Sequence, residues 1–210
     1  GVLQHYAVLP LHALVRFGRW QELLTQTRPP DGQAAYLLAM WHYARGTAWA
    51  RTERPREAHA ALQTLQSVAA EPELATTKVK NVNPAADLVH IAVLTLQADL
   101  AALEGRHGQA VAWLQQAVAA EDALAHDEPH LWLAPTRHAL GAAWLDAGRA
   151  GEAERVFRQD LRHYPENGWS LLGLKHALRR QGREREAKAV QARFQVAWRD
   201  ADVGLTRPRF

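Results

Sequence analysis

The sequence contains no cysteine among its 210 residues. This absence excludes disulfide bonds, a thiolate nucleophile and cysteine-ligated zinc or iron–sulfur sites. No uninterrupted apolar run approaches the roughly 20 residues that cross a bilayer, so we expect no membrane span. The chain begins with Gly1 rather than methionine and shows no signal-peptide pattern. We therefore expect it to be a fragment of a longer protein.

Motifs of the common enzyme classes are also missing. The sequence holds no G-x-S-x-G elbow, no P-loop, no G-x-G-x-x-G and no H-E-x-x-H. The adjacent acids Glu121 and Asp122 point about 100° apart on a helix, so they do not form a catalytic dyad by themselves. We expect neither an enzyme nor a bound cofactor.

The composition is that of a folded protein, and the net charge does not indicate a nucleic-acid partner. Lysine and arginine number 25 against 22 acidic residues, a formal charge of +3, and 48% of the residues are hydrophobic. A basic group between Lys175 and Arg193 has a local charge of +5 after Glu184 and Glu186 are counted. Such a group is found in nucleic-acid binders, but alternating Arg and Glu favour the polar outer face of a terminal helix pair. We expect no nucleic-acid partner.

A pattern of small and large residues recurs along the chain. Its complete copy consists of Leu140, Gly141, Trp144, Gly148, Ala153, Phe157 and Pro165. These residues resemble the tetratricopeptide repeat (TPR), a pair of antiparallel helices, A and B. Small residues at 141 and 153 let the two helices cross closely, large ones fill the space beside the crossing, and a proline ends helix B.

The spacing of this pattern indicates further copies. The interval of five between Gly148 and Ala153 recurs from Gly105 and from Gly182, while weaker versions have Gly18 and Glu53 at the turn. We predict an all-α fold: a right-handed α-solenoid of about five TPR-like hairpins in a single domain over residues 1–210. The predicted hairpins span residues 2–27, 33–70, 86–124, 132–164 and 168–200.

Several strings carry a closer resemblance. They are Val15-Arg-Phe-Gly-Arg-Trp20, Met40-Trp-His-Tyr-Ala-Arg-Gly46, Glu121-Asp122 with Asp127-Glu-Pro129, and Asn167-Gly-Trp169. They resemble the C-terminal part of longer bacterial TPR proteins, although Glu128-Pro129-His130 replaces the usual Glu-Pro-Pro. The resemblance implies a bacterial protein and a fold without a named reaction, and it leaves the compartment, cytoplasmic or periplasmic, open.

In TPR proteins helix A lines a concave groove that binds polypeptide segments. The resemblance places His5 and His12 on that face, together with a set of polar and aromatic residues. This set is Tyr43, Asp99, His138, Trp169, His176, Arg179 and Arg180. Arginines grip carboxylates with two parallel hydrogen bonds, so the groove suits an acidic or polar peptide. The alternative is a solvated inner face without a ligand.

A second function is metal or small-ligand binding at residues 126–138 and the groove histidines. His126, Glu128 and His130 are all plausible metal ligands. Pro129 interrupts any helix through them, so the i, i+4 geometry of helical zinc sites is not available. A charged, solvated loop is the alternative, and we favour an interaction module with a protein or peptide partner.

Overall fold

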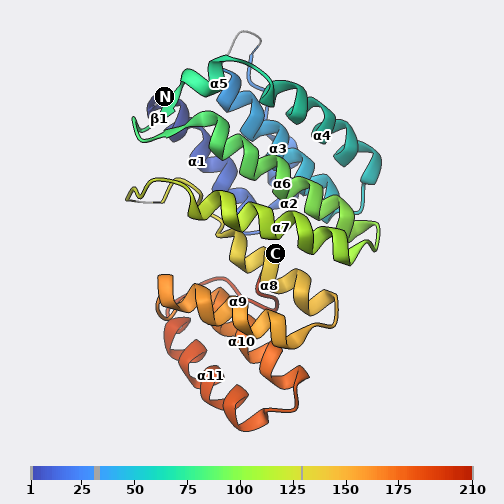
Figure 1. Cartoon of the computed structure of the whole chain (residues 1–210), viewed down its shortest axis with the longest axis vertical. Coiled ribbons are helices and arrows are strands. Elements are labelled where there is room, and N and C mark those ends of the chain that lie inside the picture. The colour runs from blue at the N-terminus through green and yellow to red at the C-terminus, as the bar shows by residue number, and fades with distance from the viewer. Residues whose placement is uncertain (1, 31–33, 129, 210) are drawn as a thin grey trace. The chain divides into compact units, whose positions relative to one another are not determined.

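The computed structural model describes residues 2–30, 34–128 and 130–209, so Pro129 lies outside the described residues. Within them the chain forms eleven helices and two two-residue strands (Figure 1), and the predicted all-α fold is confirmed. The chain divides into two compact units, residues Gly1–Ala134 and Pro135–Phe210, which are described separately. The single-domain organisation stays a prediction.

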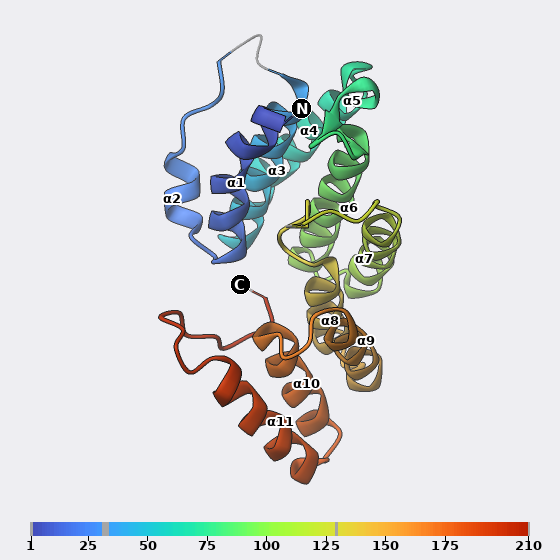
Figure 2. The ribbon, with the colours of Figure 1, turned by 90° about the vertical axis from the view of Figure 1, so that its left-hand side faces the viewer.

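The helices follow one another in pairs joined by short turns. Unit 1 contains α1 (Val2–Arg16), α2 (Trp20–Thr25), α3 (Ala35–Arg51), α4 (Pro55–Ala69), α5 (Glu73–Thr76), α6 (Ala85–Leu103) and α7 (His107–Asp122). Unit 2 contains α8 (Thr136–Asp146), α9 (Ala150–His163), α10 (Gly168–Arg180) and α11 (Glu184–Ala197). Figure 2 shows α6 beside α7 in unit 1 and α10 beside α11 in unit 2.

The same turn closes each hairpin. Its central residue has a positive φ of 58–75° and is Gly18, Glu53, Gly105, Gly148 or Gly182. The next residue is an arginine whose backbone N–H donates to the carbonyl five residues earlier, over 2.8–3.0 Å. This is the hydrogen-bond pattern of a helix ending in a left-handed residue. Glu53 therefore takes the place of the turn glycine, as the repeat spacing predicts.

The arginine after each turn is also tied to the helix that it begins. Arg19, Arg54, Arg149 and Arg183 each form an ion pair with a glutamate three residues later. In the third hairpin Arg106 instead donates to the side chain of Gln109. The pairs are exposed and individually weak, but they give each helix B the same first turn.

The core of unit 1 is built on α3 and α6. Tyr36, Met40, Leu88 and Ile91 are fully or almost fully buried there. By length and composition alone α6 is apolar enough to cross a membrane, and 61% of its most apolar window is buried inside the protein. The expectation of no membrane span rested on uninterrupted apolar runs, and polar residues such as Asp87, His90 and Asp99 interrupt this helix. Burial of α6 is typical of a core helix.

Two short strands in unit 1 were not predicted. β1 (Lys78–Val79) pairs antiparallel with β2 (Asn83–Pro84). Lys80 and Asn81, at the turn between them, both have positive φ, which asparagine tolerates better than most residues. The strands escape prediction because two residues are too few for an alternating pattern.

In unit 2 the ring of Phe157 fills the crossing between helices. Phe157 and Ala153 are fully buried on α9. A Cβ at Gly141 of α8 or at Gly173 of α10 would lie 2.3 Å from Cζ of Phe157, a distance that real contacts do not allow. The predicted roles of Gly141, Ala153 and Phe157 in the helix crossing are confirmed.

Candidate functional site

The groove residues expected in unit 1 are internal. Tyr43 is 2% exposed and packs against Trp132, with ring centroids 5.4 Å apart. Asp99 is 5% exposed and accepts a hydrogen bond of 2.9 Å from Arg51. His5 and His12 are also buried. This burial leaves these side chains little surface for contact with a peptide. Their role in lining a peptide-binding groove stays a prediction.

His138 and Trp169 come together in unit 2, in a partly buried polar network. The His138 Nε2 atom lies 3.1 Å from Oδ2 of Asp160, and Ser170 donates to the same oxygen over 2.6 Å. Burial of Asp160 opposes its ionisation, but these hydrogen bonds and the charges of His138 and Arg137 together outweigh burial and lower its pKa. The Trp169 ring stacks on His138 and meets Trp198 edge-on. His138 is thus committed to internal contacts, while Trp169 is half-buried at the rim of the network.

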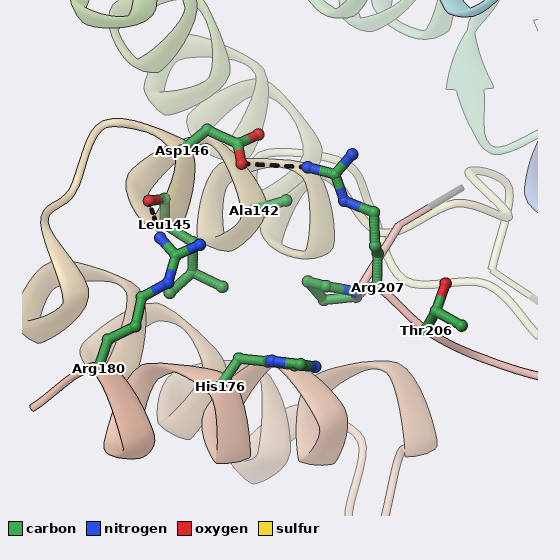
Figure 3. A pocket seen from close by; sticks show the side chains of 8 residues that line it. Ala142, Leu145, Asp146, His176, Arg180, Thr206 and Arg207 are labelled. Atoms are coloured by element: carbon green, nitrogen blue, oxygen red, sulfur yellow. Dashed lines mark hydrogen bonds and ion pairs between the residues drawn. The ribbon is translucent and has the colours of Figure 1, made fainter. Parts of the chain in front are cut away.

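His176 and Arg180 line a pocket in unit 2 (Figure 3). Its volume is about 160 Å³, and its walls are α8, α10 and the segment that follows α11. Figure 3 shows Arg180 extending from α10 toward the last turn of α8, where it donates to the carbonyl of Leu145. Arg179 is exposed beside it, 3.9 Å from Glu184, and is not part of the lining.

The segment after α11 supplies the rest of the pocket. Arg207 forms an ion pair of 3.1 Å with Asp146 at the end of α8, and its chain neighbours Thr206 and Pro208 also line the pocket. The segment is held at its start by Trp198, whose Nε1 donates to the carbonyl of Val203 over 2.6 Å. Sequence reasoning missed Arg207, because it lies beyond the last repeat and no periodic pattern places it against α8.

The pocket is electropositive. Arg180 and Arg207 face it together with one carboxylate, Asp146. Burial lowers the pKa of His176, and the nearby charges of Lys175, Arg179, Arg180 and Arg207 lower it further. The buried Nε2 of His176 has no hydrogen-bond partner among the described residues. The site therefore offers two guanidinium groups and one unused imidazole nitrogen to an anionic group.

Much of the basic group between Lys175 and Arg193 is already paired. Arg183 contacts Glu154 and Glu186, and Arg193 contacts Glu166. Lys175 is only 9% exposed, so it does not belong to an outer face. The ion pairs of Arg183 and Arg193 fit the expected polar face of a terminal helix pair.

The metal candidates lie together on the surface of unit 1. One ligand atom each from His126, Glu128 and His130 falls within 4.8 Å of the others, and all three residues are exposed. The rest of the expected 126–138 site is divided, because Leu131 and Trp132 are buried in the core of unit 1. The groove histidines do not join this cluster among the described residues.

Comparison with known proteins supports the fold. No protein-family model and no curated protein matches the chain. Two solved structures do: the nearly identical TPR-like repeats of a Podosopora anserina protein described as a kinesin light chain, and a variant of it with one substitution. Both are 18% identical to this chain with a TM-score of 0.56. The match covers 95% of each chain for the first and 93% of this chain and 92% of the other for the variant. The chain has the TPR-like helical-repeat fold.

Proposed function

We propose that the chain is an interaction module, and that unit 2 binds an acidic polypeptide segment at the pocket beneath Arg180 and Arg207. The observation that supports this proposal is the excess of cationic groups around a small pocket with a single carboxylate. Proteins with helical-repeat folds commonly bind partners on the face formed by their repeats.

The chemistry of the pocket fits a carboxylate. Each guanidinium carries five N–H donors, and the contacts of Arg180 with Leu145 and of Arg207 with Asp146 use only part of that capacity. A glutamate or aspartate side chain between them accepts charge-assisted hydrogen bonds from both. His176 is neutral at pH 7 and donates from Nε2 when that nitrogen carries the ring proton.

The size of the pocket limits what enters it. Its volume of about 160 Å³ is below the roughly 300–1,000 Å³ of pockets that enclose whole small molecules. One acidic side chain fits, and the remainder of the ligand lies along the surface. The half-buried ring of Trp169 in the same unit offers apolar area to such a segment.

The test uses synthetic peptides. A library of fluorescent 12-residue peptides with one or more Glu or Asp is screened by anisotropy, and each acidic peptide is paired with its Gln or Asn counterpart. We expect acidic peptides to bind and their amide counterparts to bind at least about tenfold more weakly, the loss typical of a charged hydrogen bond.

Variants then locate the site. Arg180→Ala combined with Arg207→Ala is expected to weaken binding by tens-fold, because truncating a central anchor typically costs about 2 kcal/mol or more. Arg185→Ala removes an equally exposed charge from α11, away from the pocket lining, and is expected to have little effect. Equal losses in the two variants, or equal binding of acid and amide peptides, overturn the proposal.

A further inference from the structure

We propose that His126, Glu128 and His130 form a binding site for a divalent transition-metal ion of the zinc class. The site lies in unit 1 and does not depend on the peptide function proposed for unit 2. It rests on three independent features: the distances between the ligand atoms, the anchoring of the loop and the chemistry of the donors.

The ligand atoms are close to the separation that a metal requires. Tetrahedral coordination with metal–ligand bonds of about 2.0–2.1 Å sets neighbouring ligand atoms roughly 3.3–3.5 Å apart. The Nε2 of His126 lies 3.4 Å from Oε1 of Glu128, already at this separation. The third ligand atom, from His130, lies within 4.8 Å of both. The two imidazoles are set edge-to-face with centroids 5.5 Å apart, and these exposed side chains need only small rotations to close the site.

The backbone before the cluster is anchored by a buried side chain. Asn83 is 4% exposed, donates to the carbonyl of Ala125 over 3.0 Å and accepts from its N–H over 2.8 Å. Ala125 immediately precedes the first histidine. The backbone immediately before His126 is therefore held in place by Asn83 of unit 1.

The backbone after the cluster is anchored by the core. Leu131 and Trp132, which follow the second histidine, are 3% and 2% exposed. Arg16 of α1 donates to the carbonyl of Leu133 over 3.0 Å. Unit 1 thus holds the chain on both sides of the cluster, at Ala125 and at Leu131.

Lysine 80 supports the middle of the loop. Lys80 donates to the carbonyl of Glu128 over 3.0 Å and forms an ion pair of 2.6 Å with Asp127. The carboxylate of Asp127 compensates the lysine charge, which otherwise opposes a cation nearby. Asp127 is thereby committed to Lys80, and Glu128 is the carboxylate that faces the histidines.

The donor set selects the class of metal. Two imidazole nitrogens and one carboxylate suit zinc, copper, nickel and cobalt, whereas calcium and magnesium require oxygen ligands. Three protein ligands leave the fourth tetrahedral position to water. The inferred ligand is a divalent ion of the first group, bound with one open position at the surface.

The experiment titrates chelator-treated protein with Zn²⁺ by calorimetry at pH 7.5 and with Co²⁺ by visible absorption. We expect one metal per chain on a monomer, and the intense visible bands of tetrahedral Co²⁺. His126→Ala with His130→Ala is expected to remove binding, and Glu128→Gln to weaken it at least about tenfold, since even ligand-orienting residues are worth that much.

The matched control is His107→Ala with His163→Ala, two exposed histidines outside the cluster, which is expected to bind zinc as the parent does. Because all the substituted side chains are exposed, circular dichroism and the melting temperature without metal should not change. No binding at roughly 100 µM Zn²⁺, full binding by the His126/His130 variant, or half a metal per chain on a dimer overturns the proposal.

Discussion

The ring of Phe157 occupies the space that a side chain at Gly141 would need. An added Cβ would lie 2.3 Å from Cζ and 2.5 Å from Cε1 of that ring. Phe157 is fully buried, and a Cβ added at Gly173 of α10 would also lie 2.3 Å from Cζ. A methyl group at either glycine would therefore overlap the ring.

Gly141→Ala is therefore expected to destabilise unit 2. Overpacking of a core typically costs about 1–3 kcal/mol, and this exceeds the gain of up to about 1 kcal/mol from replacing a helical glycine. The free energy of unfolding in urea measures the balance. Gly151→Ala in α9 is the control, because its Cβ meets nothing within 4 Å, and it should lose no stability. Equal stabilities of the two variants would show that the ring can move.

Glu53→Gly is expected to stabilise the chain by about 1 kcal/mol. Glu53 has a φ of 58°, and the left-handed region costs an L-residue other than glycine roughly 1–2 kcal/mol. Glycine also has more conformational freedom in the unfolded chain, and this entropy reduces the net stabilisation. The urea midpoint is the measurement. Gly148→Ala, at the equivalent turn, should have the opposite sign.

Stability is expected to fall in mild acid because of His12. Burial, and the charge of nearby His5, lower the pKa of His12 to about 4 from an unperturbed value of 6.5. Between these values the unfolded chain binds more protons than the folded one, so stability falls as the pH decreases from 6.5 and levels off below 4. The full difference corresponds to about 3 kcal/mol.

His12→Phe tests this expectation. The Nε2 of His12 is buried without a hydrogen-bond partner among the described residues, so phenylalanine loses no hydrogen bond there. The variant should match the parent at pH 7.5 and unfold less readily at pH 5. Melting temperatures measured from pH 4 to pH 8 give the comparison. Parallel curves for the two proteins would assign the acid sensitivity to other groups.

Peptide binding is expected to raise the pKa of His176. Burial, followed by the charges of four neighbouring cations, lowers this pKa in the absence of ligand, and a carboxylate in the pocket offsets those charges. NMR titration of the imidazole signals with and without an acidic peptide measures the change. Asp146→Asn, which removes the carboxylate already present, should lower the pKa of His176 and strengthen binding. No shift on saturation would place the peptide elsewhere.

The helices and their turns could be predicted because the signals are local. A glycine, or Glu53 in its place, marks where helix A ends, and in every hairpin but the first an alanine five positions later marks the crossing. These features depend on neighbours in the chain, so the phase of one clear repeat carries over to the others. The buried ring of Phe157 follows from the same phase.

The site could be predicted only in part, because distant segments decide which faces are covered. The repeat phase places Tyr43 and His138 on helix A, but it does not show that Trp132 covers Tyr43 or that Asp160 engages His138. Arg207 and Asp146 form an ion pair although they are 61 positions apart in the chain. No pattern in the sequence links these two residues. The metal candidates, in contrast, are neighbours in the sequence, and only their convergence required the structure.

The recurring turn makes each hairpin a self-closing piece of chain. Its backbone bonds and its arginine contact both lie within a few residues, so a hairpin gained or lost in phase with these turns leaves the remaining closures intact. The turns at Glu53 and Gly105 are 52 positions apart, whereas those at Gly148 and Gly182 are 34 apart. A segment inserted between two hairpins therefore leaves their closures intact as well.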